Sequence, residues 1–321
     1  MEICKINFVK GLFIAVFLVG CSQVDDYKKD LLQKEIKKLD IEIISPSSGI
    51  GIDDWCRVFK LTGKSTEINT ASSEEQVFIN PIKKFALLDK AIRSNHKILW
   101  AIRGGYGLDK IMPYIVKTDY SKVPKKIIVS YSDTTSLQVY FSQKYGWKNI
   151  SACTFKEIAK LEKTMESREK IINYLIGKEN QLILSALNPL NLQARQAKGI
   201  EGKTIGGNMS IIQTSIGTKW QFCGDDKIIF LEDTDVHGYK LDRILMHLDN
   251  AGVIKGAKAI IFGFFNSQDI EIISNFAKNS SIPVFQTNNF GHDQINMPIG
   301  YNFESKLLKE KNSTSFQLVM K

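Results

Sequence analysis

The chain has 321 residues, of which 43% are hydrophobic and 24% are charged, and its formal net charge is +9. This length accommodates two domains, and the composition excludes both a disordered chain and a polytopic membrane protein. The lysines behind the positive charge are spread along the sequence, with no arginine-rich patch interleaved with aromatic residues. We therefore expect a solvated basic surface and no nucleic-acid partner.

The first segment, residues 1–20, has the pattern of an export signal. Two lysines precede an apolar run over residues 11–20, which is too short to span a bilayer comfortably. The run ends in LVGC, whose last letter is Cys21, and this resembles the lipobox of bacterial lipoproteins; an uncleaved apolar anchor beside a chance cysteine is the alternative. We expect lipidation of Cys21, attachment to a membrane of the cell envelope through that lipid, and a polar tether over residues 21–40.

The body of the chain carries three cysteines, Cys56, Cys153 and Cys223. Their odd number and irregular spacing fit neither a disulfide framework nor a CxxC metal site. We expect buried free thiols, with one disulfide as the alternative.

Strand-like and helix-like segments alternate from residue 41 to about residue 145. The apolar pattern predicts strands over residues 41–44, 97–102 and 126–129 and helices over residues 85–94, 108–115 and 132–145. Turns rich in glycine and serine follow the predicted strands. This order is typical of a parallel, Rossmann-like sheet that binds ligands at the carboxyl ends of its strands.

The pattern changes near Asn188, after a predicted helix over residues 167–178. A connection over 188–202 is followed by strand-like runs over 202–205, 227–232 and 257–262 and by an amphipathic helix with Leu241, Leu245 and Leu248 on one face. We therefore predict an α/β protein with an N-terminal parallel-sheet domain over residues 41–187. A smaller, β-rich α/β domain is expected over residues 188–321.

Ser132 lies where a buried strand gives way to a helix. A serine on such a sharp turn presents its hydroxyl at a helix N-terminus, where backbone N–H groups favour developing negative charge. The arrangement follows the logic of a nucleophile elbow, although Ser130 and Thr134 stand where the G-x-S-x-G pattern has glycines. A helix cap is the alternative role for Ser132.

The glycine loop RGGYG, residues 103–107, follows the second predicted strand. Glycines permit positive φ and a close approach of the backbone to a ligand. In acyl transfer such a loop can donate an N–H to the oxyanion, and the residue after the nucleophile, here Asp133, is the usual second donor. The loop matches no phosphate-binding motif, so a purely structural turn is the remaining alternative.

A serine nucleophile needs a base, and the chain has four histidines, His96, His237, His247 and His292. His96 ends a predicted helix and His247 lies within one, so both are expected to be surface or packing residues. His292 is the leading candidate because it follows a glycine in a loop after an apolar, strand-like run, and His237 is the second candidate.

The base also needs an orienting acid that fixes its tautomer. Glu232 ends the strand-like run over residues 227–232, where active-site residues collect, and Asp233 and Asp235 compete with it. With His237 these acids suggest a metal site as a further alternative, but their spacing matches no zinc or iron pattern. We therefore expect neither a metal nor another cofactor.

Seven short motifs occur in a fixed order along the body of the chain. They are RGGYG at 103–107, YSD at 131–133, GGNMS at 206–210, LED at 231–233, YKLDR at 239–243, GH at 291–292 and PIG at 298–300. Together they resemble the LD-carboxypeptidase family of serine peptidases, which includes muramoyltetrapeptide carboxypeptidases and microcin C self-immunity peptidases. The resemblance extends from about residue 41 to residue 300.

The resemblance implies Ser132 as the nucleophile, His292 as the base and Glu232 as the orienting acid. It also implies an oxyanion hole made by the backbone N–H groups of Gly105 and Asp133, with no metal. The nucleophile comes from the first domain and the acid and base from the second, so the site is expected where the domains meet. Family members are commonly dimeric, so we expect a homodimer.

The implied activity is hydrolysis of the L,D-peptide bond that releases terminal D-alanine from murein tetrapeptides, with the murein peptide as partner. The candidates for substrate binding are Arg103, Tyr106, Asn208 and Arg243. A salt bridge within the protein is the alternative for either arginine.

Three positions depart from the family pattern. Ser130 stands where glycine is usual, ACTF at residues 152–155 replaces a His-Gly-Pro type of segment, and Phe264 replaces a frequent acid. The lipobox is a further departure, because many relatives are cytoplasmic. Two other functions stay open: a related serine hydrolase of acyl-aminoacyl nucleotides or dipeptide-like amides, and a non-catalytic, lipid-anchored muropeptide-binding protein.

Overall fold

The computed structural model describes residues 32–62 and 80–321, in two units that cover residues 1–39 and residues 40–321. In the first unit a helix occupies residues 32–37, within the predicted polar tether. The predicted signal segment and Cys21 lie outside the described residues. No helix in the described part of the chain is both long and apolar enough to cross a bilayer.

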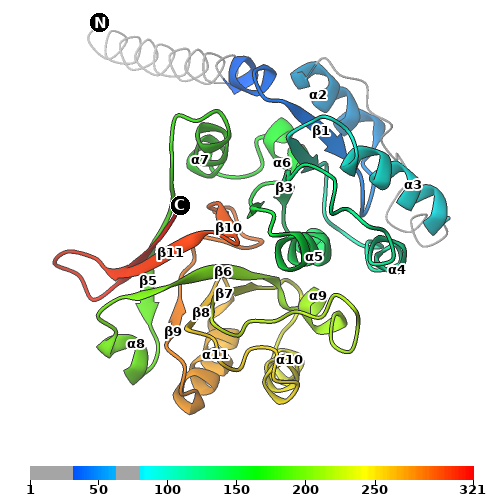
Figure 1. The fold of residues 1–321 in the computed structure, drawn as a ribbon. Helices are drawn as coiled ribbons and strands as arrows, with labels where there is room; N and C mark the ends of the chain where they lie inside the picture. Colours follow the sequence, from blue (N-terminus) through cyan, green and yellow to red (C-terminus); the bar gives the residue numbers. More distant parts are fainter. Residues whose placement is uncertain (1–31, 63–79) are drawn as a thin grey trace, which may run out of the picture. The chain divides into compact units, whose positions relative to one another are not determined.

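The second unit contains a five-stranded sheet, here called sheet A (Figure 1). Its strands, in spatial order, are β1 (Ile41–Ile44), β2 (Ile98–Ala101), β3 (Ile127–Ser130), β4 (Asn149–Ser151) and β10 (Ile299–Tyr301). The first four run parallel, and β10 pairs antiparallel with β4. The predicted α/β fold with a parallel, Rossmann-like sheet is confirmed.

Apolar runs formed the strands of sheet A because helices surround them. All four residues of β2 are buried, as are the last three of β3. Four helices lie between these strands in sequence: α2 (Ile52–Thr62), α3 (Pro81–Ile92), α4 (Met112–Ile115) and α5 (Thr135–Tyr145). Burial on both faces explains why the predicted bounds of the first three strands agree with the structure to within a single residue.

Helix α3 begins earlier than the predicted helix over residues 85–94. The side chain of Asn80 accepts a hydrogen bond from the N–H of Ile82, and Pro81 occupies the first helical position. An Asn cap followed by proline is a strong start signal, which outweighs the apolar spacing used for the prediction.

The second sheet closes into a barrel in the order β11-β12-β5-β9-β8-β7-β6. Its strands are β5 (Leu182–Pro189), β6 (Ile200–Asn208), β7 (Lys227–Glu232), β8 (Ala259–Phe262), β9 (Val284–Gln286), β11 (Glu304–Lys309) and β12 (Phe316–Met320). Strands β6 to β9 run parallel, and the other pairs are antiparallel. The β-rich second half is confirmed, whereas its closure was not foreseen.

The segment near the predicted domain boundary is more ordered than expected. The predicted connection over residues 188–202 contains helix α8 (Leu192–Gln196) and the start of β6. Strand β5 begins at Leu182, before the predicted boundary, and β10 returns from the second half to sheet A. The two sheets are therefore interleaved along the chain.

The remaining helices connect or cover the two sheets. They are α6 (Phe155–Lys160), α7 (Met165–Leu175), α9 (Met209–Thr214), α10 (Tyr239–Asn250) and α11 (Ser267–Asn279). Helix α5 packs against β6, so the helix that follows β3 contacts the barrel (Figure 1). This contact brings the carboxyl end of β3 close to the barrel strands.

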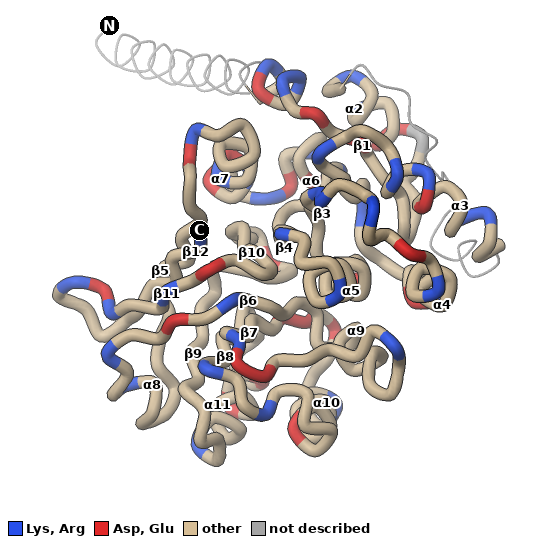
Figure 2. The backbone as a smooth tube through the Cα atoms, viewed as in Figure 1, with Lys and Arg blue, Asp and Glu red and all other residues tan. Residues whose placement is uncertain are grey.

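Two further expectations concern the distribution of positive charge and the state of the cysteines. Lysine and arginine residues are spread over many elements of the fold rather than gathered on one of them (Figure 2). The three cysteines of the body are free thiols, but only Cys153 is buried, while Cys56 and Cys223 are exposed. The expectation of burial was wrong for these two.

Candidate active site

Ser132 occupies a sharp turn between β3 and α5. Tyr131 is extended, Ser132 has φ +64°, and a 3₁₀ turn over Ser132–Thr134 leads into α5. A left-handed conformation at a residue other than glycine costs about 1–3 kcal/mol and persists only when the surroundings impose it. Here the buried amide of Gln138 donates hydrogen bonds to the carbonyls of Ser130 and Ile150, which holds α5 against the strand ends.

The glycine loop packs directly on this turn. A Cβ atom at Gly104 would lie 2.8 Å from Cβ of Ser132, which no side chain tolerates. Gly105 has φ +109°, and a Cβ there would collide with Oγ of Ser48. Within the described residues neither the Gly105 N–H nor the Asp133 N–H donates a hydrogen bond. Both predicted oxyanion donors are therefore free to bind a ligand.

His292 and Glu232 form a hydrogen-bonded pair. Nδ1 of His292 lies 2.5 Å from Oε2 of Glu232, whose side chain is 2% exposed, against 23% for the histidine. A carboxylate only accepts hydrogen bonds, so Nδ1 carries the proton and Nε2 of the neutral ring is left as a base. Strand β7 supplies Glu232 at its last residue, and the loop after β9 supplies His292.

Opposing effects set the pKa of His292, with a net rise above its usual 6.5. Burial is the largest single effect and lowers the pKa, because it penalises the imidazolium. The charge of Glu232 and the hydrogen bond to it raise the pKa and, together with the charge of Asp233, outweigh burial. The ammonium of Lys163 lowers it.

Asn208 and Asp233 decide which acid reaches the histidine. The carboxylate of Asp233 accepts hydrogen bonds from the N–H and hydroxyl of Ser210 and from the Asn208 amide. The same amide donates to Oε1 of Glu232 at 3.3 Å, which leaves Oε2 for His292. Asp233 is thus occupied at the start of α9. The side chain of Asn208 is buried, at 4% exposed. Its role as a substrate contact stays a prediction.

The pair and the serine turn meet through Tyr131. The ring of Tyr131 packs on the ring of His292, with 4.7 Å between centroids. No hydrogen bond joins Oγ of Ser132 to His292 within the described residues. Catalytic hydrogen bonds are often long before substrate binds, so this arrangement is compatible with a nucleophile and base that engage on binding.

Asp133 and Lys84 form a buried charged pair next to the serine turn, which was not predicted from the sequence. Asp133 is 2% exposed; burial raises its pKa to about 6, and its carboxylate accepts a hydrogen bond from the Leu108 N–H. Burial likewise lowers the pKa of Lys84 to about 8, and its ammonium donates to the carbonyl of Ser47. The attraction between Asp133 and Lys84 ties α3 to the turn.

The other candidate residues differ in their surroundings. Arg103 is half-buried and has no hydrogen-bond or ion-pair partner within the described residues. Tyr106 is 51% exposed, with the ammonium of Lys110 over its ring. Arg243 stacks over the ring of Tyr239 at 5.3 Å. Neither arginine forms a salt bridge with another described residue, which was the alternative considered for both.

His237, the second candidate base, pairs with a different carboxylate, that of Asp269. Its Nδ1 is 2.6 Å from Oδ2 of Asp269, and its side chain is 60% exposed. Asp235 is exposed and has φ +58°. In the described ranges, 32–62 and 80–321, no three His, Cys, Asp or Glu side chains are grouped to hold a metal ion.

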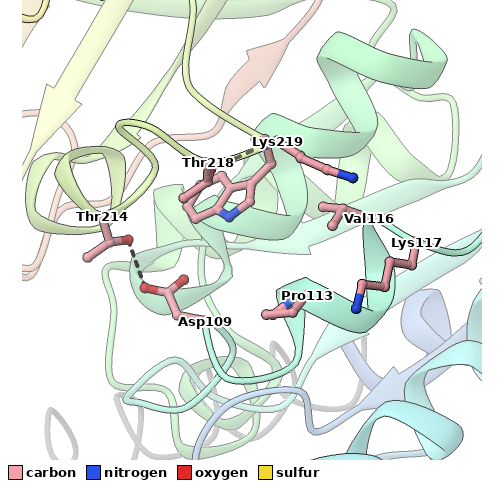
Figure 3. A pocket seen from close by; sticks show the side chains of 8 residues that line it. Asp109, Pro113, Val116, Lys117, Thr214, Thr218 and Lys219 are labelled. Atoms are coloured by element: carbon pink, nitrogen blue, oxygen red, sulfur yellow. Dashed lines mark hydrogen bonds between the residues drawn. The ribbon is translucent and has the colours of Figure 1, made fainter.

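A separate cavity lies between α4 and the segment after α9 (Figure 3). Its volume is about 390 Å³, and its lining is mostly apolar, with Trp220 and Pro113 among the residues. Oδ2 of Asp109 accepts a hydrogen bond from the hydroxyl of Thr214 at its edge. None of its lining residues belongs to the predicted triad.

Comparison with known proteins identifies the family. A model of the LD-carboxypeptidase N-terminal domain matches residues 41–152, and a model of the LD-carboxypeptidase C-terminal domain matches residues 201–307. A Rickettsia conorii protein named "Putative carboxypeptidase" is 37% identical over 301 residues, covering 89% of this chain and 92% of the relative. The "Probable murein peptide carboxypeptidase" of Bacillus subtilis is 25% identical over 211 residues, covering 61% and 65%.

Solved structures share the fold. The muramoyltetrapeptide carboxypeptidase from Oxalobacter formigenes superimposes with a TM-score of 0.71 at 20% identity, covering 87% of this chain and 98% of that one. An MccF-like protein from Bacillus anthracis superimposes with a TM-score of 0.70 at 21% identity, covering 88% and 96%. With both of the family's domains matched along its length, this chain belongs to the LD-carboxypeptidase family and is a peptidase, a hydrolase of peptide bonds.

Proposed function

We propose that this chain is a serine-type LD-carboxypeptidase that releases terminal D-alanine from murein tetrapeptides. One observation carries the proposal: a histidine oriented by a buried glutamate packs against the left-handed turn that presents Ser132. A serine used only as a helix cap needs neither the positive φ nor the neighbouring base. Ser132, His292 and Glu232 thus act as nucleophile, base and orienting acid.

The reaction is acyl transfer in two steps. Nε2 of His292 takes the proton of the Ser132 hydroxyl as Oγ attacks the carbonyl carbon before D-alanine. The N–H groups of Gly105 and Asp133 donate hydrogen bonds to the oxyanion, and the imidazolium then protonates the leaving amine. Water, activated by His292, hydrolyses the acyl-enzyme and releases the tripeptide.

Arg103 supplies recognition of the terminal carboxylate in this proposal. Its guanidinium has no partner within the described residues, and Arg103 begins the glycine loop, two residues before Gly105. A guanidinium pairs with a carboxylate through two parallel hydrogen bonds, which fixes orientation as well as position. The names of the Bacillus subtilis relative and of the Oxalobacter formigenes structure support a murein peptide as substrate.

The deciding experiment is incubation of the purified protein with murein tetrapeptide, followed by mass spectrometry for tripeptide and free D-alanine. Ser132→Ala is expected to lower kcat by about 10⁶-fold, because the nucleophile is lost. Ser130→Ala is the matched control, since this neighbouring serine is fully buried and its loss leaves the turn's nucleophile in place.

The same assay separates two other functions. The first is hydrolysis of acyl-aminoacyl nucleotides or dipeptide-like amides, and cleavage of such an amide with the tetrapeptide left intact would establish it. Muropeptide binding with neither turnover nor fluorophosphonate labelling of Ser132 would instead mean a binding protein and would refute the proposal.

We also propose that the enzyme acts at the cell envelope, attached through a lipid on Cys21, and that it is a homodimer. Murein lies outside the cytoplasm, so the lipobox pattern and the proposed substrate agree. Palmitate labelling of the wild type that is lost in Cys21→Ala tests the anchor. Light scattering of the purified protein tests the oligomeric state.

A further inference from the structure

The loop that carries His292 is held by the connection between α6 and α7. Nζ of Lys163 donates hydrogen bonds to the main-chain carbonyls of His292 and Asp293. The N–H of Thr164 donates to the carbonyl of Gln294 at 3.0 Å. The first helical turn of α7 continues the contact, because the hydroxyl of Ser167 accepts a hydrogen bond from the Asn296 N–H at 3.0 Å. A short stretch of chain thus fixes the backbone of the base loop.

The same stretch reaches the serine turn through Glu157. The hydroxyl of Tyr131 donates to Oε1 of Glu157 at 2.6 Å, and Lys163 lies 3.5 Å from the same oxygen. The ring of Tyr131 in turn packs on the ring of His292. A closed circuit therefore runs from the residue before Ser132 to Glu157, to Lys163, to the base loop and back.

Lys163 and Glu157, the charged members of the circuit, are buried, and their polar groups have hydrogen-bond or ion-pair partners. Lys163 is 7% exposed and Glu157 is 9% exposed. The ammonium has three N–H donors, and two carbonyls and one carboxylate stand around it. Glu157 is itself fixed by a capping box, in which its Oε2 accepts from the N–H and hydroxyl of Thr154. Burying an ion pair costs desolvation free energy that only good geometry and further hydrogen bonds offset, so such a pair suits orientation rather than general stability.

The matched segments are residues 41–152 and 201–307, whereas Glu157 and Lys163 lie between them. Tyr131 and His292 lie inside the matches and are the two groups that the circuit holds.

We propose that Lys163 is a positioning residue for His292: by holding the carbonyls of the base loop and, through Glu157 and Tyr131, the residue next to Ser132, it sets the reach between base and nucleophile. The inference rests on the proposed serine mechanism and deepens it. The hydrogen bonds of Lys163 go to main-chain carbonyls, and its ammonium lies beside the Glu157 carboxylate and the Tyr131 ring rather than on the Ser132 hydroxyl or the His292 imidazole. Its effect comes through the placement of the imidazole and through its charge.

The charge gives a signature that a purely structural role lacks. The charged and titratable groups facing the His292 ring are Glu232 and Asp233 at the end of β7, Lys163 before α7, and Tyr131 on the serine turn. Of these, only Lys163 brings a positive charge, and it lowers the pKa of His292. Its removal must therefore move the titration of His292 to higher pH, and Lys163→Arg should leave the titration near that of the wild type.

Lys126 offers a matched control. It is also buried, at 4% exposed, and its ammonium donates to two main-chain carbonyls, those of Ser94 and His96. It precedes β3, at the opposite end of that strand from Ser132. Lys126→Met thus removes a similar lysine and a similar pair of hydrogen bonds, far from the base.

The experiment compares the full chain with Lys163→Met, Lys163→Arg, Tyr131→Phe and Lys126→Met in two measurements. The first is an NMR titration of the His292 imidazole, assigned with His292→Gln, which needs no substrate. The second is the rate of fluorophosphonate labelling of Ser132 against pH, which needs no peptide.

For Lys163→Met we expect the His292 titration at higher pH and labelling slower by about tenfold to a hundredfold, the effect of a misplaced base. Lys163→Arg should recover most of the rate, and Tyr131→Phe, which cuts the link but keeps the ring, should lose less than Lys163→Met. Lys126→Met should match the wild type in both measurements.

An unchanged His292 titration in Lys163→Met, or equal slowing by Lys126→Met, overturns the inference. If Lys163→Met does not fold, Tyr131→Phe decides, because wild-type labelling in that variant also overturns it. A wild type that is not labelled at all refutes the serine mechanism itself, and the inference with it. Labelling without tripeptide formation refutes only the proposed substrate.

Discussion

Two histidine–carboxylate pairs in this protein look alike at close range. His292 faces Glu232 at 2.5 Å, and His237 faces Asp269 at 2.6 Å, in both cases through Nδ1. Both carboxylates are 2% exposed. The histidines differ: the side chain of His292 is 23% exposed and packs on the ring of Tyr131, whereas that of His237 is 60% exposed.

Because both pairs have a buried acid and an oriented imidazole, the proposed role of His292 as the base depends on a further feature. Asp269 also accepts a hydrogen bond from the N–H of Gly238 and lies in the first turn of α11, so it fixes a loop and a helix start. Glu232 instead ends a barrel strand and pairs with His292, whose ring packs on Tyr131 next to the serine turn. What distinguishes the pairs is that Tyr131, the residue before Ser132, packs on His292.

The largest test of this comparison exchanges the histidines for glutamine one at a time. His292→Gln is expected to lower kcat by about 10⁶-fold, because the serine loses its base. His237→Gln should leave kcat near the wild-type value. Steady-state release of D-alanine measures both variants, and a comparable loss in the two would remove the distinction drawn here.

The second test exchanges the carboxylates. Glu232→Gln keeps the shape but removes the charge that holds the tautomer, and kcat should fall by about 10⁴-fold. Asp269→Asn should keep turnover while lowering the free energy of unfolding by about 1 kcal/mol, because a buried acceptor of a loop hydrogen bond is weakened. Urea denaturation and kcat, measured on the same preparations, separate the two outcomes.

The third test uses pH. His292 must be neutral to act as the base, and its pKa is raised above 6.5. The acid limb of the kcat/KM profile should therefore have its midpoint above pH 6.5, with kcat/KM falling about tenfold per pH unit below that midpoint. In Glu232→Gln the midpoint of this limb, measured on the residual activity, should move to lower pH. Burial still lowers the pKa of His292 there, while the carboxylate that raised it is gone. Asp269→Asn should keep the wild-type limb; a shift there would mean that the wrong pair had been assigned.

Much of the fold followed from local patterns. The strands at residues 41–44 and 227–232 have the predicted bounds, because apolar runs buried on both faces leave little freedom. Barrel closure did not follow, since β11 and β12 pair with β6 and β5 across more than a hundred residues of chain. The predicted start of α3 was wrong, because the Asn80 cap followed by Pro81 sets where this helix begins.

In the candidate site, too, some features could be predicted from the sequence and others could not. The positions of Ser132, Glu232 and His292 could be named because Ser132 follows a strand, Glu232 ends one and His292 follows a glycine in a loop, where chemistry-bearing side chains are common. The choice between Glu232 and Asp233 required coordinates, because it depends on Asn208 and Ser210 occupying the aspartate. The T-x-x-E pattern of Thr154 and Glu157 is a capping-box signal that could have been used, whereas its link to Tyr131 depends on the fold.

The sequence by itself determined the α/β class, the places where strands end in glycine- or serine-rich turns, and the family to which the motifs belong. These are short-range properties, set by the spacing of apolar residues and by the few side chains that a sharp turn accepts. Only the tertiary structure decided which histidine meets the serine turn and what holds it there. Lys163 and His292 are 129 residues apart, and such a contact depends on how two sheets pack rather than on any local pattern.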